Sequence, residues 1–259
     1  MSSAKRLERI VAVRLITLFV AGVACLTTAA QAPEPPLADA RLSVHTLVRE
    51  DIFAGVLDGD LDRLALGERS IETLLERRPT ERPGLLAWKA SATLYRAVRA
   101  REAGRTEEFQ GKYAQVIDLL AEAKKLGPND PGVAAATGGM YSVLADRLPE
   151  ELRGRAWVAA YEAYQALWKV QGRGVEKLPL HLRAELLAGL AQSAQRTGRT
   201  KELAEYLDRI LAAAPDTAYA RVAKQFKDQP ATAAGTRMTC LTCHAPGRLA
   251  ARQKALGDE

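Results

Sequence analysis

The chain has 259 residues, 47% of them hydrophobic and 26% charged, and it carries a formal net charge of +6. This length is enough for one or two domains with a sizeable hydrophobic core. A mild positive charge spread along the chain argues against a nucleic-acid-binding protein, which needs a concentrated basic face.

The first 30 residues have the layout of a secretory signal peptide. Four basic side chains between residues 5 and 14 precede an apolar run from Leu15 to Leu26, which ends in small residues. A membrane-spanning helix needs about 20 apolar residues. The run is shorter, so the pattern favours export with cleavage after Ala30. The mature chain would then be periplasmic, with its net charge lowered from +6 to +3, because residues 1–30 carry four basic groups and one acid.

Two other fates of this segment stay open. It resembles a bacterial lipoprotein signal in placing Cys25 after small residues, although Gly22 stands where that pattern has leucine or another aliphatic residue. An uncleaved signal that anchors the chain is the other alternative. Membrane association is expected only through one of these two routes.

A proline-rich spacer, residues 31–41, precedes a region of helical periodicity that covers residues 42–226. Its apolar residues recur at helical spacing, and no segment shows the strict alternation of a strand. Pro131, Pro149 and Pro179 each lie where a helix could begin, since the first helical position tolerates the missing N–H of proline. The sequence therefore predicts an all-α fold.

Two segments of this region repeat one pattern. The segments AREAGRTEEF (100–109) and AQRTGRTKEL (194–203) share Gly-Arg-Thr-x-Glu between amphipathic stretches. In each, the glycine can end one helix in a left-handed conformation, and Thr106 or Thr200 can cap the next.

This pattern resembles that of tetratricopeptide-repeat proteins, whose helix-turn-helix units stack into an α-solenoid. The resemblance implies a face that binds a peptide or a partner protein. The spacing exceeds the usual 34 residues, so a looser α-solenoid or an irregular helical bundle stays open.

A linker rich in small residues, 227–239, is expected before the last segment, 240–259, which begins with Cys-Leu-Thr-Cys-His. The pattern C-x-x-C-H is the signature of covalent haem attachment, so this segment resembles a c-type cytochrome. The resemblance implies one haem c, joined by thioethers to Cys240 and Cys243, with His244 as the proximal iron ligand. Export would bring the chain to the compartment where such haems are attached.

The same three residues allow other interpretations. A zinc site needs four ligands, and this segment offers three. A redox-active thiol pair is normally found in a βαβ setting, and no strand is predicted here. The alternative function is therefore a periplasmic helical scaffold whose C-x-x-C-H motif binds metal or acts as a thiol pair.

The haem motif lacks the domain that usually surrounds it. Only 15 residues follow His244, and none is methionine. A sixth iron ligand would come from upstream, where His45 and His181 are the candidate histidines. Met140 and Met238 are the only methionines after the initiator and complete the set of candidates. We expect the helical repeats, or a partner bound to them, to supply the walls of the haem site.

Together these features predict an exported single-haem cytochrome that carries electrons and docks on a redox partner protein through its helical repeats. No catalytic residues are predicted. A haem enzyme acting on peroxide or a small oxide is a third possibility, but no second motif supports it.

Overall fold

The computed structural model describes residues 44–233 and 235–241. All regular secondary structure in these ranges is helical, which confirms the predicted all-α class. No helix in these ranges is both long enough and apolar enough to cross a bilayer. The predicted signal peptide with Cys25, the spacer, Cys243 and His244 lie outside the described residues.

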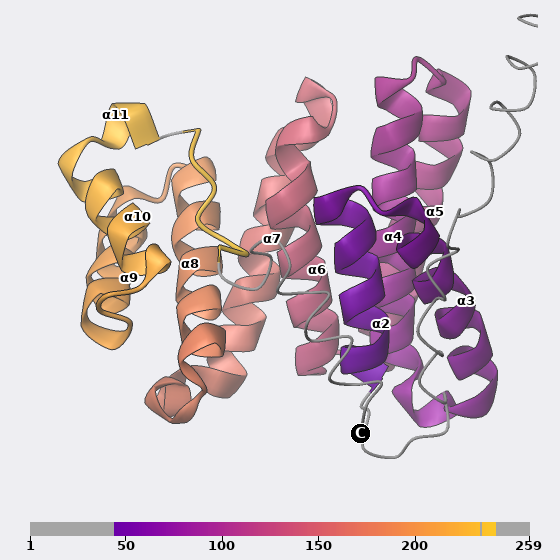
Figure 1. Cartoon of the computed structure of the whole chain (residues 1–259), viewed down its shortest axis with the longest axis horizontal. Coiled ribbons are helices and arrows are strands. Elements are labelled where there is room, and N and C mark those ends of the chain that lie inside the picture. Colours follow the sequence, from indigo (N-terminus) through magenta and orange to yellow (C-terminus); the bar gives the residue numbers. More distant parts are fainter. Residues whose placement is uncertain (1–43, 234, 242–259) are drawn as a thin grey trace, which may run out of the picture. The chain divides into compact units, whose positions relative to one another are not determined.

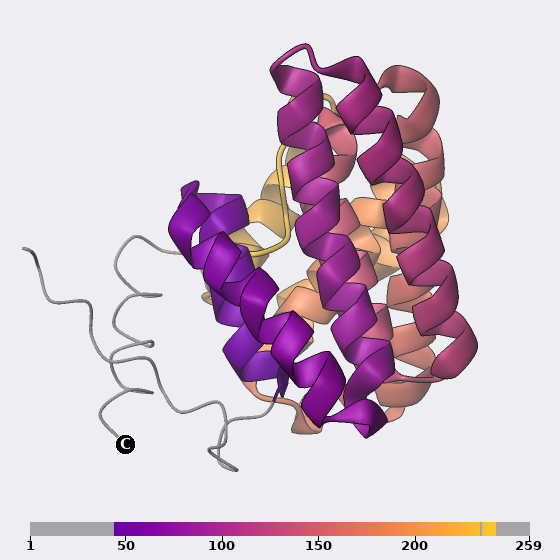
Figure 2. The same cartoon turned by 90° about the vertical axis from the view of Figure 1, so that its right-hand side faces the viewer.

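The helices follow one another as packed pairs (Figure 1). The pairs are α2 (Val44–Phe53) with α3 (Leu61–Arg77), α4 (Arg82–Glu102) with α5 (Thr106–Leu126), α6 (Pro131–Leu144) with α7 (Glu150–Gln171), and α8 (Leu180–Arg196) with α9 (Thr200–Ala213). Figure 2 shows α4 and α5 lying side by side along their length. Then α10 (Ala218–Asp228) packs on α9, and the short α11 (Pro230–Ala233) follows.

Neighbouring pairs also pack on one another, and α3 and α7, the second helices of their pairs, contact α4 and α8. Helix α4 contacts both α2 and α6, and α8 contacts α6 and α7. Short irregular turns join several helices: a π-turn at Ala54–Asp58 and 3-10 turns at Pro79–Glu81, Ala145–Arg147 and Gly172–Lys177. The fold is therefore a succession of helix-turn-helix repeats.

The repeated Gly-Arg-Thr turns behave only partly as expected. Gly104 and Gly198 adopt the predicted left-handed conformation, with φ of +74° and +72°. The threonine caps were wrong, because Thr106 is the first residue of α5 and Arg105 is its N-cap. The Phe109 N–H donates to the Arg105 carbonyl at 3.0 Å, so this helix begins one residue earlier than a threonine cap requires. The same shift occurs at the start of α9.

The prolines mark three helix starts. Pro131 is the first residue of α6, as predicted, and the Asp130 side chain accepts from the Gly132 N–H at 2.7 Å. Pro149 and Pro179 lie one position earlier than predicted. Each is an N-cap in extended backbone rather than the first helical residue. In both places the proline carbonyl accepts the first helical hydrogen bonds.

The buried ring of Tyr164 fixes the contact of α7 with its neighbours. Tyr164 is 3% exposed. Its ring lies between Gly138 of α6, where an added Cβ would be 3.1 Å from Cδ2, and Gly189 of α8, where an added Cβ would be 2.1 Å from Cζ. The two glycines therefore leave the space that this ring occupies between α6 and α8.

Candidate functional site

The chain turns back onto the helical domain after α11 (Figure 1). The predicted linker, 227–239, contains the end of α10 and all of α11. Met238, Thr239 and Cys240 are 1%, 0% and 6% exposed. The first cysteine of the C-x-x-C-H motif is thus held within the fold rather than on an extended tail.

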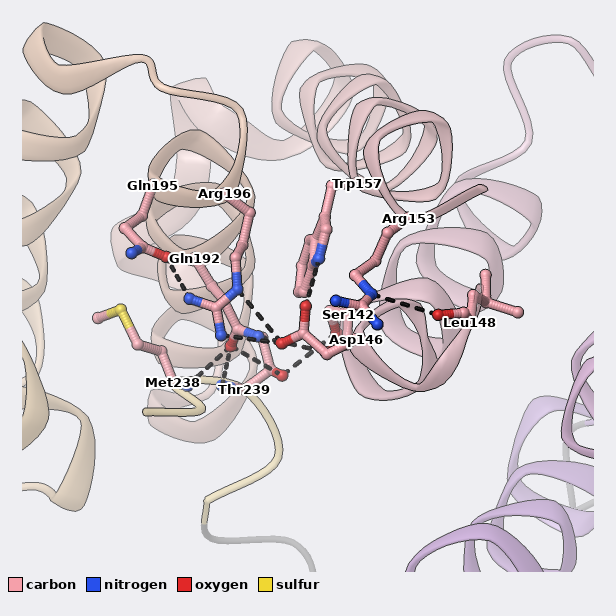
Figure 3. A network of polar contacts seen from close by, with 10 residues as sticks. All are labelled: Ser142, Asp146, Leu148, Arg153, Trp157, Gln192, Gln195, Arg196, Met238 and Thr239. Atoms are coloured by element: carbon pink, nitrogen blue, oxygen red, sulfur yellow. Dashed lines mark hydrogen bonds and ion pairs between the residues drawn. The ribbon is translucent and has the colours of Figure 1, made fainter. Parts of the chain in front are cut away.

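Gln192 of α8 binds the backbone of this returning segment (Figure 3). Its Oε1 accepts hydrogen bonds from the Met238 N–H at 2.7 Å and from the Thr239 N–H at 3.1 Å. Its Nε2 donates to the Ser142 carbonyl of α6 at 3.2 Å. One buried amide therefore joins α6, α8 and residues 238–239, and satisfies two backbone donors that have no helical partner.

Further polar contacts brace the same region (Figure 3). The hydroxyl groups of Ser142 and Thr239 lie 3.2 Å apart. Asp146 accepts from the Trp157 indole N–H at 2.7 Å and forms an ion pair with Arg196 at 2.9 Å. These contacts tie the α6–α7 turn to the end of α8 and to Thr239.

Glu185 holds Cys240 itself. Its Oε2 accepts from the Cys240 N–H at 2.8 Å and from the Tyr219 hydroxyl at 2.7 Å. The Cys240 thiol donates to Oε1 at 3.5 Å. Cys240 has a left-handed φ of +59°, a conformation that costs a non-glycine residue about 1–2 kcal/mol. The carboxylate of Glu185 offsets that cost by binding the Cys240 backbone and fixes the orientation of the cysteine.

The pKa of Glu185 is raised in the folded chain, which makes the stability of the protein depend on pH. Removal of its carboxylate from water raises its pKa, although hydrogen bonds from Tyr219 and Cys240 oppose the shift. The folded chain therefore keeps a proton at a pH where the unfolded chain has lost it. Stability falls as the pH rises from the ordinary glutamate pKa through the raised one.

Replacing Glu185 with glutamine should remove this dependence. We expect the free energy of unfolding of the wild type to be lower at pH 8 than at pH 5, and that of Glu185→Gln to change less over the same interval. Urea denaturation of both proteins at the two pH values measures the difference. An equal change in the free energy of unfolding between pH 5 and pH 8 in the two proteins would show that Glu185 is not the source of the pH dependence. Glu176→Gln, on the 3-10 turn Gly172–Lys177, is the control.

Cys240 also lies in the wall of a cavity of about 410 Å³. Helices α2, α4, α6, α7 and α8 line this cavity together with Cys240. We call it the Cys240 bay, and its aromatic, aliphatic and histidine side chains include Phe53, Trp88, Tyr164, Leu167, Leu186 and His181. Phe53 and Trp88 meet edge to face, with ring centroids 5.5 Å apart.

The Cys240 bay has the volume of a cofactor site, and its lining is mostly apolar but also includes Arg49, Glu50, Gln171 and Glu185. Cofactor sites are concave, mostly apolar and about 300–1,000 Å³ in volume. A haem joined to Cys240 would have its attachment atom in the cavity wall and aromatic and aliphatic side chains around its ring. Over residues 44–233 and 235–241, no group of three or more His, Cys, Asp or Glu side chains is placed to hold a metal ion.

Of the iron ligands that the sequence offers, His181 lines the Cys240 bay and the two methionines do not. His181 is the second residue of α8, is exposed, and lies on the Cys240 bay. His45 is in α2, but its side chain lies outside the described residues. Met140 and Met238 are 2% and 1% exposed and belong to the hydrophobic core. Neither methionine lines the bay.

Sequence reasoning missed Glu185 and Gln192, the two residues of α8 that hold the segment. One signal was present: these polar residues interrupt an apolar stretch and are seven positions apart, which places them on one face of a helix. The pattern does not reveal what they bind. Comparison with protein-family models, with curated proteins and with solved structures finds no match to this chain.

Proposed function

We propose that the protein is an exported, single-haem c-type cytochrome that carries electrons and is periplasmic. The observation that carries the proposal is the burial of Cys240 in the wall of a cavity lined mostly by apolar and aromatic side chains. The first residue of a C-x-x-C-H motif thus adjoins a space with the properties of a cofactor site. The helical repeats supply the side chains that line this cavity.

The roles of the motif residues follow from their chemistry. The thiols of Cys240 and Cys243 would each add across a vinyl group, so that a C–S bond forms and the thiol hydrogen goes to the neighbouring vinyl carbon. No electrons are gained or lost in this addition. His244 would be the proximal ligand, and the bound haem would supply one-electron redox chemistry. Glu185 acts as a positioning residue, because it orients Cys240 through its N–H.

A redox partner protein is the second component of the proposal. The succession of helix pairs suits a tetratricopeptide-like domain, whose repeats in that family form a binding face for a peptide or protein. A carrier needs such a partner to donate or accept its electron.

Covalent haem content tests the proposal directly. Expression with a haem-attachment system should yield a mature chain heavier by one haem, and a pyridine haemochrome spectrum should show the c-type band. Cys240→Ser combined with Cys243→Ser should reduce covalent haem to background, because no thiol remains at the motif. Cys25→Ser is the matched control and should leave the haem content of the mature chain unchanged.

The rival function, a helical scaffold whose motif binds metal or acts as a thiol pair, gives a different result. The wild-type chain would then mature without haem and stay colourless, and the double serine variant would lose bound metal or a reversible disulfide instead. Elemental analysis and thiol titration of both proteins distinguish these outcomes. A colourless, stable wild-type protein would rule out the cytochrome.

A further inference from the structure

We infer that the haem lies in the Cys240 bay and that His181 is its second axial ligand, opposite His244. This inference rests on the proposed function, since it assumes a haem joined to Cys240. It goes further by assigning both the cavity and the ligand to this chain rather than to a partner.

The position of His181 on α8 carries the first step. Glu185 is four residues after His181, so the two side chains lie on the same face of the helix, one turn and about 6 Å apart along its axis. Glu185 accepts the Cys240 N–H at 2.8 Å. The attachment point of the haem and the histidine are therefore held by successive turns of one helix.

The Cys240 bay supplies the second step. His181 and Cys240 both line it, and Leu182, next to His181, lines it too. A thioether at Cys240 keeps the porphyrin edge beside Cys240, so the ring occupies the cavity that begins there. An imidazole in the wall of that cavity is placed to meet the iron on one side.

The reach of the tail supplies the third step. His244 is four residues after Cys240, and an extended chain spans at most about 3.3–3.6 Å per residue. The Cα atom of His244 therefore stays within about 14 Å of the Cα atom of Cys240. Because Cys240 is fixed to α8, the proximal ligand comes from the tail and the second ligand from the helix.

The chemistry of the candidates favours the same residue. Met140 and Met238 are buried in the hydrophobic core and do not line the bay. A neutral imidazole on each side gives a six-coordinate, low-spin iron and a lower reduction potential than a methionine would. His45 is one turn before Arg49, which also lines the bay, and it provides the matched control.

The experiment compares the haem-loaded wild type with His181→Ala and His45→Ala. Absorption and electron paramagnetic resonance spectra of the ferric proteins report the spin state, and carbon monoxide binding reports an open position on the ferrous iron. His181 is exposed, so His181→Ala should keep the wild-type helicity and covalent haem content. We expect it to change most of the iron to five-coordinate, high-spin and to bind carbon monoxide readily. Added imidazole should restore the low-spin spectrum, and His45→Ala should match the wild type.

The outcomes separate this inference from the proposed function. A wild type with no covalent haem overturns both. A wild type with covalent haem whose His181→Ala variant stays low-spin, or whose His45→Ala variant alone becomes high-spin, overturns the ligand assignment and leaves the cytochrome standing. A haem-loaded wild type that is already five-coordinate overturns the assignment in the same way.

Discussion

Replacing Gln192 with leucine should release residues 238–240 from α8 while the helical repeats stay folded. Leucine has a similar volume but cannot accept the two N–H bonds from Met238 and Thr239 or donate to the Ser142 carbonyl. A buried donor left without a partner costs about 1–3 kcal/mol. With two donors affected, we expect docking to weaken by about 3 kcal/mol. Amide protection in this segment should then fall by about 100-fold, since each 1.4 kcal/mol is a factor of ten.

Hydrogen exchange read by mass spectrometry over a peptide containing residues 235–241 measures the effect. Gln195→Leu is the matched control, because Gln195 is on the same helix and its side chain accepts a hydrogen bond from Arg196 rather than from the returning segment. The control should leave the protection of this peptide unchanged. Wild-type protection in Gln192→Leu would show that packing of Met238, rather than the amide, holds the segment.

Replacing Gly189 with alanine should destabilise the whole helical domain. The added Cβ would lie 2.1 Å from Cζ of the buried Tyr164 ring, a distance at which the ring or α8 must move. Overpacking of this kind costs about 1–3 kcal/mol. Gly138 restricts the ring on its other side, so we expect the upper end of that range, about 3 kcal/mol, and a fall in Tm of roughly 10 °C.

Gly154→Ala is the matched control for this substitution. Gly154 is exposed in α7, and nothing lies within 4 Å of a Cβ added there. Alanine is favoured over glycine within a helix by about 0.5–1 kcal/mol, so this variant should be slightly more stable than the wild type. Thermal unfolding followed by circular dichroism measures both. Equal melting temperatures for Gly189→Ala and the wild type would mean that Tyr164 has room to shift.

The helices were predictable because their signals are local. The spacing of apolar residues places each helix, and the left-handed turns at Gly104 and Gly198 follow from the glycines themselves. The threonine caps failed because arginine, with no capping side chain, occupies the N-cap position in both repeats. Two candidate N-cap positions one residue apart have nearly the same local sequence, so the sequence does not show which of them begins the helix.

The candidate site was predictable only at its chemical centre. The C-x-x-C-H motif identifies Cys240 from five consecutive residues. The bonds that hold Cys240 and Met238 come from Glu185 and Gln192, which are 55 and 46 residues away. Such bonds depend on how α8 lies against α6 and α10, which no local pattern encodes. The segment 227–239 has a loop-like composition, and its last two residues, Met238 and Thr239, are buried against these distant partners.

Glu185 and Gln192 hold the returning segment by its backbone N–H groups. Two turns of α8, about 10.5 Å, separate these two acceptors, and they match consecutive donors on the segment. Most side chains at positions 238 and 239 leave these donors in place, and only proline removes one. An insertion between Thr239 and Cys240 would therefore separate the donors that now meet Gln192 and Glu185, whereas residues 235–237 make none of these bonds.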